Sequence, residues 1–469
     1  MISRQFNLDD QLKFAELSGD CNPAHIDPVE ARRLIFGRPV VHGIHALLWS
    51  LENVFLNIKG PLQLTTLKTS FKRPIGIEEK LFLQKIKTTH QKIEFQLATD
   101  VAASAHVIVS YQPIPSTDEE IYYKIGLPPK YESKALEASQ LDNASGDLDL
   151  YFDKDETSRL FPELSRKLPP SQLAHLLALT RLIGMECPGL HSIFSELNIN
   201  FINPVKSANK LEYKVKNFIS RISLATIDVS TSSMKGTLKA FLRPPVQTQQ
   251  SYKALKDIVQ PMEFSNQKAL IIGGSRGLGE VTAKLLSAGG AKVTITYHKG
   301  LKEAQSLVED ISNAGGNIKS IQMNILKPDI KGIDDNITHL YFFPTPYIHA
   351  GAHRSFSYRL FKEFSDYYVD GFMNTVLKLR EYLPGPLKCF YPSSTALDEL
   401  PPNMGEYSAA KAAGETLCNW LEKTHPEISI FQTRLPRTQT DQTTSLLPAG
   451  KNDPVELMLT LLRRFQQSA

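Results

Sequence analysis

A carboxylate and an imidazole lie five residues apart near the start of the chain, in the run SGDCNPAHID at residues 18–27. The Gly-Asp and Asn-Pro dipeptides of this run favour turns, so we expect Asp20 and His25 on an irregular loop rather than on one helix face. An isolated Asp and His are usually ordinary loop residues. Held together, they can act as general acid and general base, each proton transfer being worth roughly 10²–10⁴-fold in rate.

A second pair of reactive side chains lies in YSAAKAAGE at residues 407–415. Tyr407 and Lys411 are four residues apart, so on a helix they share a face. A lysine cation beside a phenol favours the phenolate. The spacing therefore predicts a tyrosine that exchanges protons with the help of the lysine.

The run KALIIGGSRGLGEVTAKLLSAGGAKVTITY at residues 268–297 predicts a strand, a glycine-rich turn, a helix and a second strand. Gly273 suits the tight turn, Gly277 lets backbone amides approach a diphosphate, and Gly279 permits close packing of the helix. The start of a helix favours an anion. A glycine turn alone is weak evidence, but Tyr407 and Lys411 further along strengthen it.

Regular elements must position these residues. Ile44, Leu47, Leu48, Leu51 and Phe55 fall on one face of a predicted helix. Strand-like runs follow at residues 63–71, 80–86, 93–99 and 106–112.

The same pattern recurs at an offset of 130 residues. FKRPIGIEEKL at 71–81 returns as FINPVKSANKL at 201–211, and His45 falls on His175 within a second helical run. Strands are predicted at residues 195–201, 210–215, 220–230 and 235–242. We interpret this as a duplication. The offset carries the positions of Asp20, Asn22 and His25 to Leu150, Phe152 and Asp155, so the second copy lacks the acid/base pair.

Composition indicates an ordinary globular chain. With 469 residues, two to four domains are expected. A net charge of +4 does not indicate binding to nucleic acid or to an anionic membrane.

The four cysteines show no metal-ligand spacing, so we expect reduced thiols and no metal. The N-terminal run lacks a signal-peptide pattern, which predicts a cytoplasmic protein. Residues 113–146 are expected to be a surface connection, and a second polar stretch at residues 244–266 leads into a new pattern.

The runs SGDCNPAHID and FGRPVVHG resemble the MaoC-like dehydratases and (R)-specific enoyl-CoA hydratases, which have the hotdog fold. The resemblance covers about the first 110 residues. It implies that Asp20 and His25 hold one water molecule and exchange protons as that water adds to a 2-enoyl thioester or leaves a 3-hydroxyacyl thioester. Asn22 would order the loop beside the substrate, and the N–H of Gly43 would stabilise the enolate oxygen.

The glycine turn together with Tyr407 and Lys411 resembles the short-chain dehydrogenase/reductase family, from Lys268 to about Asp441. The resemblance implies that Tyr407 is the general acid, that Lys411 lowers the pKa of the phenol and holds the nicotinamide ribose, and that Ser394 orients the substrate oxygen. Ser393 is the alternative residue for orienting the substrate oxygen.

The implied cofactor is NADP(H). The second strand ends in TYHKG without an acidic residue, and Arg276 is placed to meet a 2′-phosphate. The expected cofactor-binding residues are Gly273, Ser275, Arg276, Gly277, Leu278, Gly279, His298, Asn324 and Lys411.

Three departures from the reductase pattern leave a silent nucleotide-binding domain as an alternative. Phe343, Pro344 and Thr345 stand where the family has Asn-Asn-Ala-Gly, and Pro436-Arg437 replaces Pro-Gly. Asp370 takes the place of an asparagine in the proton relay.

The sequence thus predicts an α+β double hotdog followed by an α/β Rossmann-fold domain. The expected domains are a catalytic hotdog at 1–115, a non-catalytic hotdog at 116–250 and a dehydrogenase/reductase at 265–469. The expected function is bifunctional, with hydration or dehydration of acyl thioesters and 3-ketoacyl reduction. Reduction of another carbonyl and a carrier-docking scaffold are the alternatives. The thioester would be carried by CoA or by an acyl carrier protein, and a homodimer through the Rossmann domain is expected.

Overall fold

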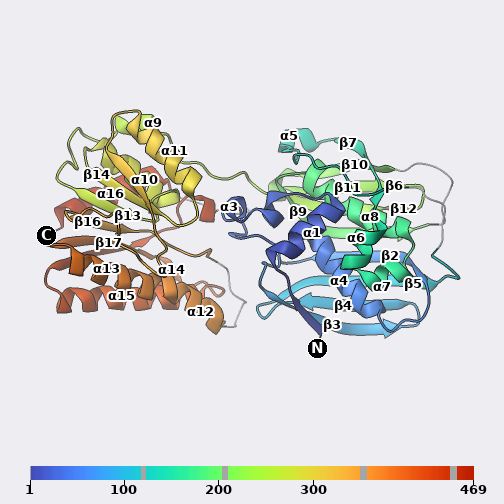
Figure 1. Ribbon diagram of the computed structural model, residues 1–469. Coiled ribbons are helices and arrows are strands. Elements are labelled where there is room, and N and C mark those ends of the chain that lie inside the picture. Colours follow the sequence, from blue (N-terminus) through green and yellow to red (C-terminus); the bar gives the residue numbers. More distant parts are fainter. Residues whose placement is uncertain (1, 118–122, 203–209, 349–355, 444–451, 469) are drawn as a thin grey trace. The chain divides into compact units, whose positions relative to one another are not determined.

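The computed structural model describes residues 2–117, 123–202, 210–348, 356–443 and 452–468, with Lys85 and Ile86 as backbone only. These residues form two compact units, one reaching to Pro245 and one beginning at Val246 (Figure 1). No helix among the described residues combines the length and the apolar character needed to cross a membrane.

An antiparallel sheet forms the first unit. Within the described residues it has ten strands. In spatial order they are β1 (Ile2–Gln5), β3 (Lys80–Thr89), β4 (Lys92–Ala98), β5 (Ala103–Pro113), β2 (Leu62–Phe71), β9 (Ser192–Phe201), β12 (Met234–Leu242), β11 (Leu224–Ser230), β10 (Lys210–Ile219) and β7 (Ser145–Asp149).

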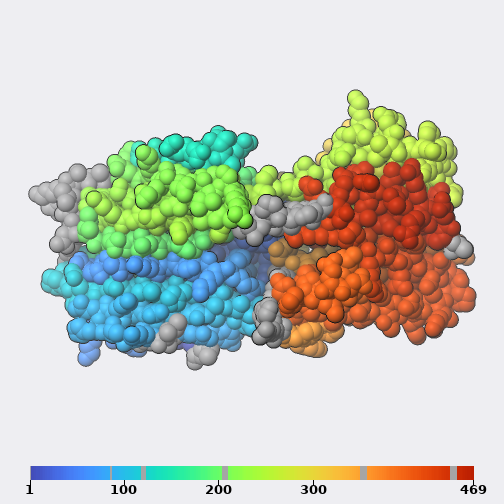
Figure 2. Space-filling view, turned by 180° about the vertical axis from the view of Figure 1, so that it is seen from behind, coloured from blue at the N-terminus to red at the C-terminus, as the bar shows by residue number. Residues whose placement is uncertain are grey.

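The two halves of this sheet have the same topology. Each half runs from a short outer strand through three consecutive strands to one long inner strand, and the inner strands β2 and β9 pair at the centre. The strand β9 begins 130 residues after β2 (192 against 62), and β10 begins the same distance after β3 (210 against 80). The 130-residue offset of the sequence is therefore present in the strands. Figure 2 shows the two halves, blue to cyan and green, packed directly against each other.

Two apolar helices cover one face of the sheet (Figure 1). They are α4 (Gly43–Phe55) and α8 (Pro170–Arg181), which continues as the π-helix η1 (Leu182–Glu186). Leu47 of α4 and Leu177 of α8 belong to one continuous buried cluster. The two halves thus share a single core.

Short elements complete the first unit. They are α1 (Leu8–Ser18), α2 (Pro23–Ile26), α3 (Pro28–Ala31), β6 (Lys124–Ile125), α5 (Ala138–Leu141), β8 (Tyr151–Phe152), α6 (Lys154–Leu160), α7 (Pro162–Lys167) and η2 (Ser220–Ile222). The last of these corrects a prediction. The single strand expected at 220–230 is interrupted, because η2 and the left-handed Ser223 (φ 51°) reverse the chain before β11.

The second unit is a parallel sheet covered on both faces. Its described strands follow the order β15 (Ile318–Gln322), β14 (Lys292–Tyr297), β13 (Lys268–Ile272), β16 (His339–Phe342), β17 (Leu387–Ser394) and β18 (Ile428–Leu435). This is the 3-2-1-4-5-6 order of the doubly wound Rossmann fold. The predicted α/β architecture is confirmed.

The helices of the second unit fall on two sides of the sheet. One buried cluster includes residues of α10 (Gly277–Ala288), α11 (Leu301–Ser312) and α16 (Pro454–Gln467). Another includes residues of α13 (Phe372–Tyr382) and α15 (Gly405–Thr424). The remaining helices are α9 (Tyr252–Lys256), α12 (Tyr358–Ser365), the π-helix η3 (Asp366–Gly371), α14 (Ala396–Glu399) and η4 (Asp441–Thr443).

Candidate active sites

The loop that carries Asp20 begins where α1 ends. Gly19 closes α1 with a left-handed backbone, φ 76°, which glycine adopts without steric cost. Asn22 then caps α2 by accepting a hydrogen bond from the N–H of Ala24 at 3.1 Å. The side-chain amide of Asn22 donates to the Gly184 carbonyl oxygen at 3.0 Å. Backbone groups of both halves therefore hold the Asn22 side chain.

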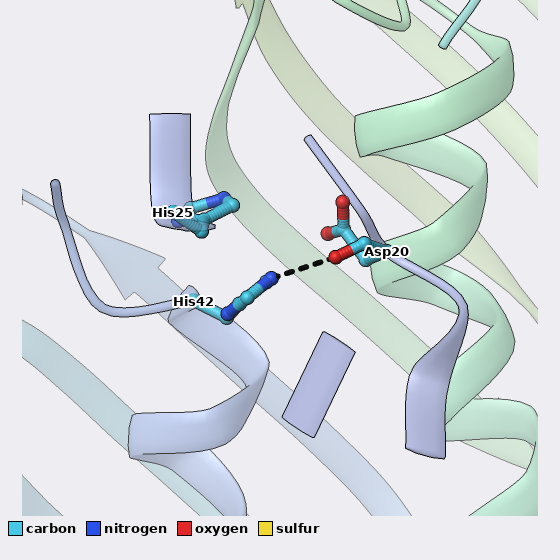
Figure 3. A group of neighbouring side chains, drawn as sticks. All are labelled: Asp20, His25 and His42. Atoms are coloured by element: carbon cyan, nitrogen blue, oxygen red, sulfur yellow. Dashed lines mark hydrogen bonds between the residues drawn. The ribbon is translucent and has the colours of Figure 1, made fainter. Parts of the chain in front are cut away.

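Asp20, His25 and His42 form one cluster (Figure 3). One nitrogen or carboxylate oxygen of each lies within 4.8 Å of the others, and the two imidazole rings stack with their centroids 3.8 Å apart. His25 Nδ1 lies 2.7 Å from the Val40 carbonyl oxygen. Because a carbonyl only accepts, Nδ1 carries the proton, and Nε2 of the neutral ring has a lone pair. His25 can therefore take a proton at Nε2.

Both ring nitrogens of His42 lie close to oxygen atoms of the chain. Its Nε2 lies 2.9 Å from the Asp20 carbonyl oxygen, and its Nδ1 lies 2.9 Å from Gln11 Oε1. The whole residue is buried. The His42 ring therefore serves as the surface against which the His25 ring packs.

Burial moves the pKa values of the acid/base pair toward each other. It raises the pKa of Asp20, against the opposing effects of His25, Thr180 and the Asn22 amide. It lowers the pKa of His25, against the opposing effect of Asp20. Burial thus favours the neutral imidazole of His25, which is the form that can take a proton.

Gly43 is the first residue of α4, close to this cluster in sequence. The helix begins at Gly43 without a side-chain cap, so its first amides are available to an anionic oxygen. A Cβ at Gly43 would come 3.1 Å from Cε1 of Phe71. The absence of a side chain there lets the start of α4 lie against that ring.

In the second unit, Tyr407 and Lys411 lie on α15, and Ser394 ends β17. Tyr407 is hydrogen-bonded to Ser394. Ser393 Oγ instead donates to Glu415 Oε1 at 2.5 Å. The structure therefore brings Ser394, rather than Ser393, to the tyrosine.

The environment of Lys411 differs from the expected one. Its ammonium donates to the Pro392 carbonyl oxygen at 2.7 Å and lies 3.9 Å from the centre of the Tyr368 ring. Burial lowers the pKa of Lys411 to about 7. Burial raises the pKa of Tyr407, and the hydrogen bond with Ser394 opposes this. The expectation that Lys411 lowers the phenol pKa is not met in this arrangement, because the cation faces a carbonyl and an aromatic ring.

The expected position of Asp370 is wrong. The Asp370 side chain is exposed, while Tyr368 contacts Lys411 and its hydroxyl lies 2.6 Å from Thr345 Oγ1. Both residues belong to η3. Because a π-helix has one more residue per turn than an α-helix, the facing residue shifts along the sequence.

The expected cofactor-binding residues gather at the C-terminal ends of the parallel strands. Gly273 and Gly277 have left-handed backbones, with φ 72° and 58°, and a Cβ on Gly279 would overlap the Gly273 carbonyl oxygen. The helix α10 begins without a side-chain cap. A tight turn of bare backbone leading into free helix amides fits a diphosphate.

The other predicted residues surround this turn. Ser275 is buried, and Leu278 packs on the core. His298 is exposed just after β14. Asn324 follows β15, and its Oδ1 accepts a hydrogen bond from the N–H of Leu326 at 3.0 Å. Arg276 was expected to await a 2′-phosphate. It is paired with Asp441 instead, Nη1 to Oδ2 2.7 Å.

Comparison with known protein families matches two parts of the chain. Residues 2–108 match the MaoC like domain, and residues 267–335 match the short chain dehydrogenase family. The chain carries a MaoC-like domain and a short-chain dehydrogenase domain. The second match ends before Tyr407 and Lys411, so the assignment of these two residues depends on the sequence motif and on the geometry above.

The relatives cover limited parts of the chain. The (R)-specific enoyl-CoA hydratase of Aeromonas caviae is 35% identical over 82 residues, which are 17% of this chain and 60% of that protein. The 3-oxoacyl-(acyl-carrier-protein) reductase of Synechocystis is 38% identical over 63 residues, 13% of this chain and 26% of that protein. Both matches thus span less than two thirds of the relative's length. The NADP complex of FolM alternative dihydrofolate reductase 1 from Brucella canis has a TM-score of 0.38 at 18% identity and covers 44% of this chain and 89% of that structure.

Residues outside the matched part of the MaoC-like domain complete the Asp20 site. Thr180 Oγ1, at the end of α8, donates to Asp20 Oδ2 at 2.6 Å. A Cβ on Gly184 would overlap the Asp20 carboxylate. The sequence analysis did not identify Thr180 or Gly184, because both lie about 160 positions from Asp20 and belong to no motif. The one signal in the sequence was the glycine at position 184, which follows the second predicted helical run.

The segment expected to be a surface connection also reaches this site. A Cβ on Gly19 would come 2.7 Å from Cγ of Pro128, within the segment. The N–H of Lys134 donates to the Met185 carbonyl oxygen at 2.8 Å. The described residues of this segment are mostly exposed, and around Pro128 and Lys134 the segment also packs beside the MaoC-like loop.

Proposed function

We propose that the MaoC-like domain adds water to trans-2-enoyl thioesters, giving (R)-3-hydroxyacyl thioesters, or catalyses the reverse dehydration. The observation that carries the proposal is His25 with a free Nε2 beside the buried Asp20 carboxylate. The water oxygen bonds to C3 while His25 Nε2 takes a proton from that water. The pair then returns one proton to C2 on the same face, and the first amides of α4 stabilise the enolate oxygen.

We propose that the first unit is a double hotdog, with domains at 1–115 and 116–250. The repeated strand order and the 130-residue offset support it. At the positions equivalent to the acid/base loop, Leu150 and Phe152 are buried in the core and Asp155 is exposed. The second copy therefore supports the catalytic loop of the first and carries no such loop itself.

Residues 1–245 produced alone are expected to be soluble and to hydrate crotonyl-CoA, because both halves of the sheet and Thr180 are present. Residues 1–115 alone are expected to aggregate, because β2 loses its partner β9 and exposes a sheet edge. Size-exclusion chromatography and the hydration assay test both. A soluble, active 1–115 fragment would refute the duplicated arrangement.

Replacing Thr180 by valine is expected to slow hydration roughly 10- to 100-fold, because a hydrogen bond to a charged group contributes about 1.5–3 kcal/mol. The carboxylate oxygen of Asp20 then lacks its hydroxyl donor. Thr180→Ser, which keeps the hydroxyl, is the matched control and should retain most of the rate. Equal rates for the valine and serine variants would show that the hydroxyl does not position Asp20.

We propose that the short-chain dehydrogenase domain, at residues 265–469, binds NADP(H) and reduces a 3-ketoacyl thioester. The glycine turn and the uncapped start of α10 fit the cofactor diphosphate. When bound, the cofactor supplies the hydride for the carbonyl carbon. Ser394 orients the carbonyl oxygen, and the Tyr407 hydroxyl gives that oxygen its proton.

A nucleotide-binding domain with little turnover is the second candidate. The contact of Lys411 with Tyr368 and the ion pair of Arg276 with Asp441 favour it, because both cations are engaged by side chains of the chain itself.

The two proposed activities share the (R)-3-hydroxyacyl thioester, which is the product of the reduction and the substrate of the dehydration. The partners would be acyl-CoA or acyl carrier protein thioesters in fatty-acid or polyketide metabolism in the cytoplasm. A homodimer through the second unit remains part of the proposal and is testable by light scattering.

Two assays on the purified chain test the function. Crotonyl-CoA should lose its enoyl absorbance and yield the (R)-3-hydroxy product. Acetoacetyl-CoA with NADPH should consume the nucleotide. Binding of NADPH without consumption would favour the second candidate, and no reaction with crotonyl-CoA would refute the hydratase.

A further inference from the structure

A buried carboxylate holds the arginine of the glycine turn. Arg276 Nη1 lies 2.7 Å from Asp441 Oδ2, and the side chains are 23% and 4% exposed. Asp441 opens η4, in the segment that follows β18. The guanidinium at the start of α10 is thus neutralised by a residue 165 positions further along the chain.

Asp441 also lies against the backbone of the turn. A Cβ on Gly277 would come 3.8 Å from Thr440 and 4.0 Å from Asp441 Oδ1. Gly277 is the first residue of α10, where the amides have no side-chain cap. A carboxylate at this position opposes a diphosphate, because like charges in a poorly solvated site repel each other strongly.

We propose that Asp441 sets the nucleotide affinity and selectivity of this site. It places a negative charge beside the diphosphate position, and it engages the guanidinium that would otherwise meet a 2′-phosphate. The proposal rests on the NADP(H) function proposed above and names the residue that limits it. Removal of the charge strengthens the binding of NADPH and NADH alike, and release of Arg276 strengthens NADPH further.

Fluorescence titration of the full chain with NADPH and with NADH tests this without any turnover. In Asp441→Asn the Kd for NADPH is expected to fall roughly tenfold, equivalent to about 1.4 kcal/mol, and the Kd for NADH roughly threefold. Asp441→Glu keeps the charge and should show no gain. Asp257→Asn, at the exposed end of α9, makes the same change in net charge away from the turn and should leave both constants unchanged.

The double variant Arg276→Ala/Asp441→Asn separates the two effects. It should keep the gain for NADH and lose the additional gain for NADPH, because no guanidinium is left to bind the 2′-phosphate. Thermal melting reports whether each variant is folded, and Asp441→Thr replaces Asp441→Asn if the latter unfolds.

Each other result overturns the proposal in a distinct way. Weaker NADPH binding by Asp441→Asn would mean that Asp441 orients Arg276 for the phosphate. Unchanged binding of both nucleotides would mean that the carboxylate does not act on the site, while the cofactor proposal stands. Absence of binding by wild type and variant alike would end the cofactor proposal and this inference together.

Discussion

Hydration of crotonyl-CoA is expected to fall at least roughly 10³-fold when Asp20 is replaced by asparagine or His25 by glutamine, since each proton transfer is worth roughly 10²–10⁴-fold. Asparagine keeps the shape of Asp20 and can still accept from Thr180 Oγ1, but it cannot carry a proton. Glutamine at position 25 has no basic nitrogen to replace Nε2. Both substitutions therefore remove the chemistry while changing the volume of the site little.

The control for these variants is Asp9→Asn, which changes an exposed carboxylate on α1. Its hydration rate should equal that of the wild type. Nucleotide affinity should be unchanged in all three variants, because it belongs to the other unit. A residual rate above about 1% in Asp20→Asn or His25→Gln would exclude that residue as an essential acid or base.

Reduction of acetoacetyl-CoA by NADPH is expected to fall roughly 10²-fold or more in Tyr407→Phe, in line with the loss of a general acid. The phenylalanine ring preserves the edge-to-face packing of Tyr407 on Phe364 and Tyr368. Only the hydroxyl that bonds to Ser394 is removed. The Kd for NADPH should therefore be retained, and the loss should appear in kcat.

Tyr358→Phe is the matched control, because this side chain is 74% exposed on α12. It should reduce acetoacetyl-CoA at the wild-type rate. An unchanged kcat in Tyr407→Phe would mean that another group supplies the proton. The first candidate would be the Tyr368 hydroxyl, which is hydrogen-bonded to Thr345.

Much of the architecture follows from local sequence signals. The glycine turn predicted the bare backbone before α10, and the 130-residue repeat predicted β9 and β10 from β2 and β3. Turn dipeptides predicted Asp20 and His25 on one loop. Asp20 lies on that loop, whereas the prediction is wrong for His25, which lies on the short helix α2. These signals act within a few residues or repeat with a fixed period, so a single sequence displays them.

The remaining site contacts depend on residues that meet only after folding. Thr180 reaches Asp20 because α8 packs beside the loop, and Asp441 reaches Arg276 because the chain returns after β18. Neither pair has a spacing that marks it. The prediction placed Asp370 beside Lys411, but the structure has Tyr368 there. The reason is that the π-helix η3 has a different number of residues per turn from the α-helix that the prediction assumed.

The hydrogen bond between Thr180 and Asp20 joins the two halves of the first unit at the proposed acid/base site. A site assembled from two separate chains is lost on dilution, because the two subunits dissociate. Here the peptide chain itself keeps both contributors at a fixed ratio and at a high effective concentration. The hydration rate per molecule should thus stay constant at any dilution of the enzyme. In a homodimer every substitution appears in both subunits, whereas here a substitution in one half leaves the other half unchanged.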